Sequence, residues 1–462
     1  MMQRTLSLFA VSLTLFGTIL PSTAWSAELP DIVVYLADDL SANDLSTYGG
    51  RGIETPSAEK LARAGMTFDR AFVASPSCAP SRAALLTGLM PARNGAEENH
   101  TYPHKELLKL PRLLNRMGYQ TAAFGKVAHN KSAKDYGFEV INLQKDFPDL
   151  QTNVADFLTT RKDSRPLALF VGTSNPHVPW PADGTIPPNE IDLPSKLLDT
   201  PQTRVQRSRY MHEVRELDLY LGKLRDLASK TLGSEHVFIF SSDHGAQFPF
   251  GKWTLYDEGI RVPLIIDWPG RTSPGTHTDA MVSWIDLLPT IIDAAGGALP
   301  EGIDGRSFAA VLDNSAESHR KAIFTTHSGD RKMNVYPSRS VRTRRYKFIH
   351  NLHPEFAFTT HIDLLVRTTS GDYFLEWQEL AKTDAVAART LAAYHGRPEF
   401  ELYDLATDRE ERTNLANSPE HAGAMEALKE KLHDWMKQQG DAGTVFHPPL
   451  LLDAPETWRA RK

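Results

Sequence analysis

The chain has 462 residues, of which 41% are hydrophobic and 23% are charged, and its formal net charge at pH 7 is −6. This acidic balance argues against a general nucleic-acid binder, which needs a basic surface to meet the phosphates. The length exceeds what one compact core usually holds, so we expect two domains.

The N-terminal segment has the pattern of a secretory signal. Arg4 supplies a positive start, residues 6–20 form an apolar run, and Ser26 and Ala27 are small residues suited to cleavage. The apolar run is too short for a comfortable membrane span. We therefore expect residues 1–27 to be a signal peptide, and the mature protein to be periplasmic or secreted. No later apolar run has membrane-spanning length, so a transmembrane protein is not expected.

Apolar runs in the larger part of the chain predict buried strands of a mixed or parallel sheet. The strands are expected at residues 31–37, 119–124, 167–172 and 236–240. Helical patterns between them predict helices at residues 57–64, 107–117 and 209–229. This alternation predicts an α/β fold in which helices sandwich a large, mostly parallel sheet.

The last third of the chain predicts a second, smaller domain. A helix expected at residues 283–296 lies near the end of the first domain. We expect the first domain to span residues 28–316, and a C-terminal subdomain with a tail to span residues 317–462. The elements expected there are strand-like runs at 322–327 and 340–350, a strand and turn within 400–416, an amphipathic helix at 420–439 that could cover the sheet, and an extended tail at 447–462.

Every predicted strand of the first domain is followed at once by ionisable residues. In open α/β sheets, ligands bind outside the carboxyl ends of the strands. Four such endings together indicate one shared site at this edge of the sheet. The residues concerned are Asp38, Asp39, Lys126, His129, His177, Asp243 and His244.

Three of these residues, Asp38, Asp39 and Asp243, indicate a site for a hard divalent cation such as calcium or magnesium, which prefers carboxylate oxygens. Neighbouring side chains on a strand point to opposite faces, so Asp38 and Asp39 can share an ion only if the backbone turns there. His244 suits transition metals better, so it either binds the ion or hydrogen-bonds the substrate. Taken alone, the aspartate pair is better explained as a solvated turn or a helix cap, and it is the second strand end, at Asp243, that favours the metal site.

Cys78 is the only cysteine of the chain, and it lies between two prolines. A lone cysteine is usually a small buried hydrophobe. In an exported protein it cannot form an intramolecular disulfide, and a free reactive thiol would be prone to oxidation. Cys78 is therefore either buried and inert or chemically converted into another group.

The residues from Cys78 to Arg82, "CAPSR", followed by "AALLTG", resemble the signature of type I sulfatases. Further segments resemble that family in the same order along the chain: "DDL", "GYQTAAFGKVAH", "SNPHVPW", "SDHGAQFPFGKWTLYDEGIRVPLI" and "ELYDLATDREERTNLA". The spacing in "GKVAH" is similar to the iduronate-sulfatase-like branch, and "DHGAQFPFGK" is similar to the sulfamidase (N-sulfoglucosamine sulfohydrolase-like) branch. The resemblance implies an alkaline-phosphatase-like catalytic domain and a small C-terminal antiparallel sheet with one helix.

The resemblance also implies what Cys78 becomes. A formylglycine-generating or sulfatase-maturating enzyme would oxidise it to formylglycine (3-oxoalanine), whose aldehyde hydrates to a diol. One hydroxyl would attack the sulfur and displace the substrate alcohol. The second hydroxyl would then lose its proton, so that the aldehyde reforms as sulfate leaves.

The family pattern implies a role for each further site residue. One calcium ion, with magnesium as the less expected alternative, would be bound by Asp38, Asp39, Asp243, His244 and position 78. Arg82 would hold the diol, Lys126 would contact the nucleophile or the sulfate, and Lys252 would bind sulfate oxygens. His129 would accept the proton that triggers elimination, and His177 would act as general acid on the leaving group.

The substrate is expected to be a sulfated carbohydrate, with Asn99, His100 and His327 as weaker candidates for substrate contacts. An arginine cluster suits a glycan that contains uronic acid, because arginine binds carboxylate and sulfate in a bidentate manner. For most of these arginines, however, a solvated strand edge is the preferred interpretation. They are Arg331, Arg339, Arg342, Arg344 and Arg345. A sulfamidase, or a phosphonate or phosphate ester hydrolase of the same superfamily, remains an alternative function.

Overall fold

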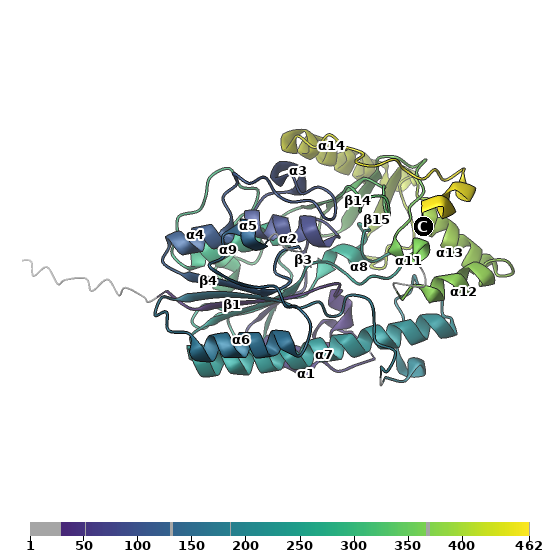
Figure 1. Cartoon of the computed structure of the whole chain (residues 1–462). Helices are drawn as coiled ribbons and strands as arrows, with labels where there is room; N and C mark the ends of the chain where they lie inside the picture. The colour runs from purple at the N-terminus through teal and green to yellow at the C-terminus, as the bar shows by residue number, and fades with distance from the viewer. Residues whose placement is uncertain (1–28, 51, 130–132, 185, 366–369, 462) are drawn as a thin grey trace, which may run out of the picture.

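The structure, a computed structural model, describes residues 29–50, 52–129, 133–184, 186–365 and 370–461. The predicted signal peptide, residues 1–27, lies outside these residues. Figure 1 shows a central sheet with helices on both faces and a second, smaller sheet beside it. None of the helices in the described part of the chain is long and apolar enough to cross a membrane.

The central sheet has eight strands in the order β10-β2-β9-β7-β1-β6-β4-β5. Strands β10-β2, β7-β1, β1-β6, β6-β4 and β4-β5 pair in parallel, and only β9 runs antiparallel to its neighbours β2 and β7. The bounds are β1 Ile32–Ala37, β2 Met66–Phe68, β4 Gln120–Gly125, β5 Val140–Asn142, β6 Leu167–Gly172, β7 Val237–Ser242, β9 Leu264–Asp267 and β10 Thr276–Thr278. The predicted mixed, mostly parallel sheet is confirmed.

The register of the inner strands positions the site. The last residue of β1, Ala37, pairs with Ser242 at the end of β7, and Leu36 pairs with Gly172 at the end of β6. Gly125, which ends β4, pairs with the same Gly172. These strands are buried along their length because helices cover both faces. Four chain segments therefore leave the sheet at the same edge.

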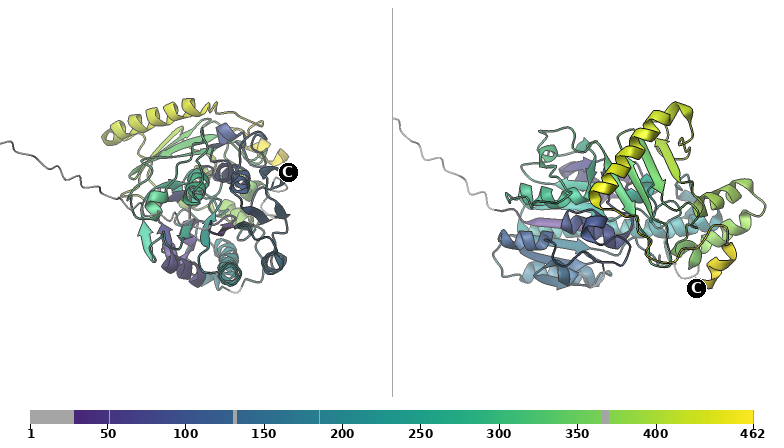
Figure 2. Two further views of the ribbon diagram at one scale, coloured as in Figure 1. Left: turned by 90° about the vertical axis from the view of Figure 1, so that its left-hand side faces the viewer. Right: turned by 90° about the horizontal axis from the view of Figure 1, so that it is seen from above.

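One face of the sheet is covered by α1, α6 and α7, and the other by α2, α4, α5 and α9 (Figure 1; Figure 2, left). Helix α7 is longer than the predicted helix at 209–229, because Pro201 occupies its first turn and the Thr200 side chain accepts a hydrogen bond from the Thr203 amide. The bounds are α1 Pro56–Ala64, α2 Cys78–Thr87, α4 Leu110–Arg116, α5 Ala133–Tyr136, α6 Asp149–Thr160, α7 Pro201–Leu232 and α9 Leu287–Ala294.

A minor three-stranded sheet and several short helices complete the larger part of the fold. The sheet has the order β11-β3-β8, with bounds β3 Ala71–Phe72, β8 Arg261–Val262 and β11 Val282–Ser283. The short α-helices are α3 Pro91–Asn94, α8 Asp257–Ile260 and α10 Ala309–Leu312. Described 3-10 helices lie at Ala42–Asp44, Ser46–Tyr48, Pro188–Glu190, Trp284–Asp286, Pro419–His421 and Pro455–Arg461.

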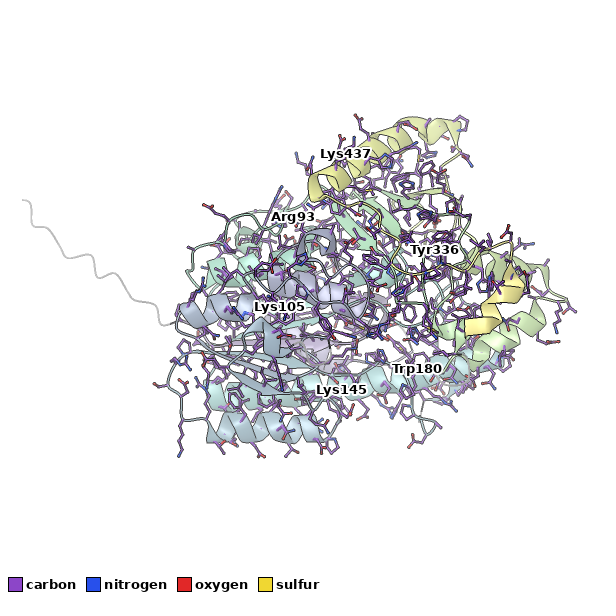
Figure 3. All side chains as sticks on the ribbon, turned by 45° about the horizontal axis from the view of Figure 1, so that its top comes forward. Arg93, Lys105, Lys145, Trp180, Tyr336 and Lys437 are labelled. Atoms are coloured by element: carbon purple, nitrogen blue, oxygen red, sulfur yellow. The ribbon has the colours of Figure 1, made fainter. Side chains whose placement is uncertain are left out.

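The C-terminal region forms an antiparallel sheet in the order β12-β13-β14-β15, and α14 lies across it (Figure 2, right). Apolar side chains of the sheet, Val341, Phe348 and Leu402, pack with Met425, Leu428 and Leu432 of α14. The side chain of Lys437, on the outer face of α14, is 81% exposed. Tyr336, which precedes β13 in the chain, is buried (Figure 3). The bounds are β12 Ile323–His327, β13 Ser338–Arg342, β14 Tyr346–Asn351, β15 Phe400–Asp404 and α14 Ala422–Gln439.

The structure corrects two sequence-based expectations here. The strand-like run 340–350 is two strands, because a turn in which the Thr343 amide donates to the Tyr346 carbonyl separates β13 from β14. The tail is not wholly extended, since residues 455–461 form a 3-10 helix. Three helices that the sequence analysis did not predict lie between β14 and β15: α11 His361–Leu364, α12 Asp372–Leu380 and α13 Ala385–His395. The domain boundary near residue 316 stays a prediction.

Candidate active site

The candidate site begins where β1 ends. Asp38 and Asp39 follow the strand directly, and the backbone turns at Asp39, whose φ of 69° lies in the left-handed region. This conformation is uncommon for a residue with a side chain, so the surrounding structure must hold it. The turn brings both carboxylates to the same side of the sheet edge, where both are fully buried.

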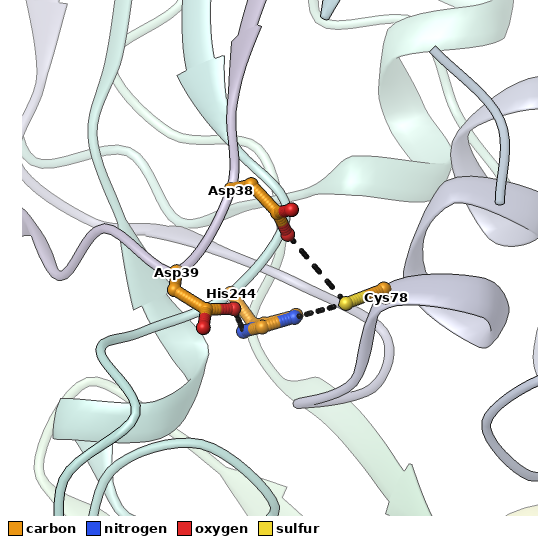
Figure 4. Close-up of side chains that lie close together, drawn as sticks. All are labelled: Asp38, Asp39, Cys78 and His244. Atoms are coloured by element: carbon orange, nitrogen blue, oxygen red, sulfur yellow. Dashed lines mark hydrogen bonds and ion pairs between the residues drawn. The ribbon is translucent and has the colours of Figure 1, made fainter. Parts of the chain in front are cut away.

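Asp38, Asp39, Cys78 and His244 each contribute a possible ligand atom to one group, and these atoms lie within 4.8 Å of one another (Figure 4). The Cys78 Sγ lies 3.5 Å from Asp38 Oδ1 and 3.2 Å from His244 Nε2. His244 Nδ1 lies 3.5 Å from Asp39 Oδ1. Two carboxylates and an imidazole fit a divalent cation, so the donor set is compatible with a metal ion.

Asp243 lies beside this group. Its Oδ1 accepts a hydrogen bond from the Asp39 amide at 3.2 Å and lies 3.6 Å from His244 Nε2. Its Oδ2 accepts a hydrogen bond from Arg82 Nε at 2.8 Å. Arg82 extends from α2 one turn after Cys78, and its NH2 group also donates to the Ala37 carbonyl at 3.2 Å. The helix that carries Cys78 is thereby fixed to the ends of β1 and β7.

Two lysines complete the charged cluster. Lys126, which follows β4, donates from Nζ to Asp38 Oδ2, and its Nζ lies 3.4 Å from the Cys78 Sγ. Lys252 Nζ lies 2.8 Å and 3.1 Å from the two carboxylate oxygens of Asp39. Burial alone would raise the pKa values of Asp38 and Asp39, but the nearby cations outweigh it and lower both, so these groups are ionised.

Three carboxyl groups of the cluster, those of Asp38, Asp39 and Asp243, lie against the cations of Lys126, Lys252 and Arg82. Burial raises the pKa of Asp243, although Arg82 and His244 partly offset this effect. A divalent cation would leave the cluster with a net positive charge, which suits an anionic substrate.

The thiol of Cys78 is poorly suited to act as a nucleophile itself. It is 2% exposed, and burial raises its pKa well above the ordinary value, although Lys126 and Lys252 partly offset this effect. A thiol is a good nucleophile only as the thiolate. In the unmodified chain, residue 78 is therefore a neutral thiol at neutral pH.

The two predicted acid–base histidines lie on either side of this cluster. His177 Nε2 lies 3.9 Å from Asp39 Oδ2, while its Nδ1 donates to the Val178 carbonyl at 2.6 Å. Burial lowers the pKa of His177 to about 4. His129 Nε2 lies 2.7 Å from His100 Nδ1, and burial, followed by Lys126, lowers the pKa of His129 to about 2.

The three weaker candidates for substrate contacts have protein partners. Asn99 Oδ1 accepts a hydrogen bond from the Ala79 amide at 3.1 Å, and its Nδ2 donates to Asp330 at 3.0 Å. His100 lies between His129 and Asp330. His327 is fully buried in β12, where its Nε2 lies 2.8 Å from Asn334 Oδ1, and no contact found in the described residues joins it to the charged cluster.

The arginine cluster of the smaller sheet is mostly paired with aspartates. Arg339 is fully buried and bonds Asp441 at 2.5 Å, and Arg342 lies 3.0 Å from Asp257, so neither belongs to a solvated strand edge. Arg344 pairs with Asp279, and Arg345 pairs with Asp404. Arg331 is exposed and has no ion pair or hydrogen bond within the part of the chain that the structure describes.

Sequence reasoning did not predict the contacts that join Asp330, Trp253 and His361. Asp330 Oδ2 accepts a hydrogen bond from Trp253 Nε1 at 2.8 Å, and the His361 ring stacks on Trp253 with a centroid distance of 5.4 Å. No strand-end pattern marks these residues, because Asp330 and Trp253 lie outside the strands and helices and His361 begins the short helix α11, and only tertiary packing brings the three together.

Comparisons with known proteins agree with this architecture. The sequence model of the sulfatase family matches residues 30–298, and the model named N-sulphoglucosamine sulphohydrolase, C-terminal, matches residues 244–364. An ulvan-active sulfatase of Formosa agariphila is 30% identical over 434 residues, which cover 90% of this chain and 81% of that protein. Human N-sulphoglucosamine sulphohydrolase is 30% identical over 468 residues, covering 88% of this chain and 90% of that protein.

Solved structures show the same fold at lower identity. A protein solved with its substrate D-glucosamine-2-N,6-O-disulfate has a TM-score of 0.67 and 20% identity, covering 90% of this chain and 99% of that chain. A phosphonate monoester hydrolase from Silicibacter pomeroyi has a TM-score of 0.68 and 18% identity, covering 90% of this chain and 96% of that chain. The family match spans more than half of the sequence. The chain belongs to the sulfatase family, enzymes that hydrolyse sulfate esters.

Proposed function

We propose that this chain removes sulfate from a sulfated carbohydrate, with formylglycine made from Cys78 as the nucleophile. The observation that carries the proposal is the position of residue 78. Its Sγ lies within 3.5 Å of Asp38, His244 and Lys126, at the junction of the possible metal ligands and the cationic side chains. A hydroxyl of the hydrated aldehyde would occupy this position and supply the nucleophile.

The metal proposed for the site is one calcium ion, held by Asp38, Asp39, Asp243, His244 and position 78. Buried carboxylates that point to one place support a hard cation. When bound, the ion would acidify the nucleophile and neutralise sulfate oxygens. His244 is the one ligand less usual for calcium.

The remaining side chains have distinct proposed tasks. Arg82 holds position 78 in place and offsets the negative charge that develops there. Lys126 and Lys252 bind the sulfate oxygens, a role supported by their contacts with Asp38 and Asp39. His177 donates a proton to the leaving oxygen, and His129 accepts the proton whose loss releases sulfate.

The substrate class is proposed from the relatives and from the charges at the site. Relatives named an ulvan-active sulfatase and an N-acetylgalactosamine-6-sulfatase support a carbohydrate sulfate ester. A uronic acid in that glycan would be recognised by Arg331, which follows Asp330 directly and has no ion pair in the described residues. The protein is proposed to be exported and to be matured by a formylglycine-generating enzyme.

A sulfamidase is the second candidate function. The C-terminal family match at residues 244–364 and the human relative both support it. Phosphonate hydrolysis has weaker support, since the similar structure is 18% identical and indicates the fold alone.

A comparison of substrates tests these proposals. Purified protein with calcium is assayed with an aryl sulfate, an aryl phosphate and an aryl phosphonate monoester, and then with O-sulfated and N-sulfated oligosaccharides. Release of sulfate from O-sulfated glycans supports the first proposal, and release from N-sulfated glucosamine alone supports the second. Faster cleavage of the phosphate or phosphonate than of every sulfate would contradict both.

A further inference from the structure

A buried carboxylate outside the predicted site ends a chain of two histidines that leads into it. Asp330 is 1% exposed, and its Oδ1 lies 3.4 Å from His100 Nε2. His100 Nδ1 lies 2.7 Å from His129 Nε2, and the two rings meet edge to face with centroids 4.6 Å apart. His129 follows β4 in the loop that also carries Lys126.

The surroundings hold Asp330 rigidly. Its Oδ2 accepts hydrogen bonds from Trp253 Nε1 at 2.8 Å and from Asn99 Nδ2 at 3.0 Å. The backbone amide of Asn99 also donates to the Gly329 carbonyl at 2.9 Å. Both the side chain and the backbone of Asn99 therefore join its loop to the loop that carries Asp330. Because Oδ2 already has two donors, Oδ1 is the oxygen that faces His100.

The backbone of His100 supports a specific role for its ring. Its φ of 67° lies in the left-handed region, which is costly for a residue with a side chain. The cost is of the order of 1 kcal/mol or more and is tolerated where the surrounding structure requires that conformation. Here the conformation places the ring between Asp330 and His129, with one ring nitrogen directed to each.

The hydrogen-bond chemistry then sets the tautomers. A carboxylate only accepts hydrogen bonds, so His100 carries its proton on Nε2 and presents the lone pair of Nδ1 to His129. His129 therefore carries a proton on Nε2 and has its lone pair on Nδ1. When His129 gains a second proton, the charge is stabilised through His100 by the buried carboxylate.

We propose that Asp330 and His100 are positioning residues, which fix the tautomer of His129 and stabilise its protonated form during turnover. This inference deepens the proposed function and rests on the role of His129 as a base. It gives His100 a different role from the substrate contact predicted from the sequence. We name Asp330, His100 and His129 together the Asp330 relay.

Other charged groups near the relay also affect the pKa values that a pH profile would report. Besides burial, the pKa of His129 is lowered by Lys126 and Arg82 and raised by Asp38. The pKa of Asp330 is lowered by His361. Burial raises the pKa of Asp330, but the hydrogen bond from His100 and the nearby His361 and Asn99 lower it below its usual range, so the carboxylate stays charged. Substituting Asp330 changes one of these charges and leaves the others in place.

The test is the substitution Asp330→Asn, which keeps the shape and removes the charge. We expect kcat to fall about 10- to 100-fold, because tautomer and charge support are lost while the base itself remains. We expect KM to change less than about threefold, since no group that binds sulfate is altered. The acidic limb of the kcat–pH profile should move to lower pH, because protonated His129 loses its carboxylate support.

Two further variants make the result specific. His100→Gln should give a loss similar to that of Asp330→Asn, and the double variant should be no worse than either single variant, because both act through one path. The matched control is Ser328→Ala in the same loop, since Ser328 is buried and its hydroxyl has no hydrogen-bond partner among the described residues. Its kinetics should equal those of the wild type.

The outcomes separate the relay from the proposed function. The wild type is first shown to carry formylglycine at position 78 and to release sulfate. If the wild type does neither, the proposed function fails, and the relay fails with it. If the wild type turns over but Asp330→Asn keeps the wild-type kcat, the relay alone is refuted. A fall in kcat without a shift of the acidic limb would also refute it, since mere disturbance of the fold predicts that result.

Discussion

Replacing Arg82 by methionine tests how the site is held together. Arg82 is fully buried, and its guanidinium bonds Asp243 at 2.8 Å and the Ala37 carbonyl at 3.2 Å. It also donates to the carbonyl of Lys126. Methionine has a similar length but no donor, so the substitution leaves a buried carboxylate and two backbone carbonyls without these partners.

The expected loss of stability follows from these contacts. Removing one partner of a buried ion pair costs about 3–5 kcal/mol. Each buried acceptor left without a donor costs roughly 1–3 kcal/mol, although relaxation and water recover part of this. We therefore expect Arg82→Met to lower the free energy of unfolding by about 5 kcal/mol, a large part of the roughly 5–15 kcal/mol of a typical domain.

The assay is urea unfolding followed by circular dichroism and tryptophan fluorescence, with Arg344→Met as the matched control. Arg344 pairs with Asp279 at the surface, and its side chain is 59% exposed, so the same replacement should cost less than about 1 kcal/mol. Equal stability of Arg82→Met and the wild type would refute the assignment of Arg82 as the residue that fixes α2 to the ends of β1 and β7.

Three further predictions concern other parts of the account. Cys78→Ala should abolish turnover yet lower the free energy of unfolding by only about 1 kcal/mol relative to the unmatured thiol form, since one buried sulfur atom is lost; kinetics and urea unfolding measure both, and retained turnover would contradict the role of position 78. Arg331→Gln should raise KM for a uronic-acid oligosaccharide about tenfold and leave KM for an aryl sulfate unchanged; equal effects on both would exclude selective recognition of the uronate. Burial raises the pKa of Asp363 to about 7, so the folded chain binds a proton that the unfolded chain lacks between about pH 4 and pH 7, and stability falls as the pH rises through this range. Asp363→Asn should remove up to about 3 kcal/mol of this pH dependence in urea titrations at pH 5 and pH 8, and an unchanged slope would show that Asp363 does not titrate there.

Four of the eight strands of the larger sheet, β1, β4, β6 and β7, could be predicted from sequence, because they are short apolar runs that are followed within a few residues by ionisable side chains. The strand predicted at 167–172 coincides with β6, Leu167–Gly172. Parallel pairing brings the carboxyl ends of such strands to one edge, so local patterns at Asp38 and Asp243 were enough to predict that they would lie close together.

The parts that could not be predicted depend on pairing between distant segments. Nothing in the local sequence of Asp330 indicates Trp253 as its donor or His100 as its neighbour. The arginines of β13 gave a misleading signal for the same reason. Arg339 looks like part of a basic surface until Asp441, 102 residues later, lies against it. A run of charged residues indicates that a segment can bind groups of opposite charge. It does not indicate which residue of the fold will pair with it.

The most direct test of the central claim is the chemical state of position 78 in active protein. Preparations made with different amounts of maturating enzyme are digested, and the peptide that contains residue 78 is quantified by mass spectrometry alongside the turnover number. Turnover should rise in proportion to the fraction of peptide that carries the aldehyde, and should extrapolate to zero when that fraction is zero. Full turnover by protein whose residue 78 is still a thiol would contradict the account.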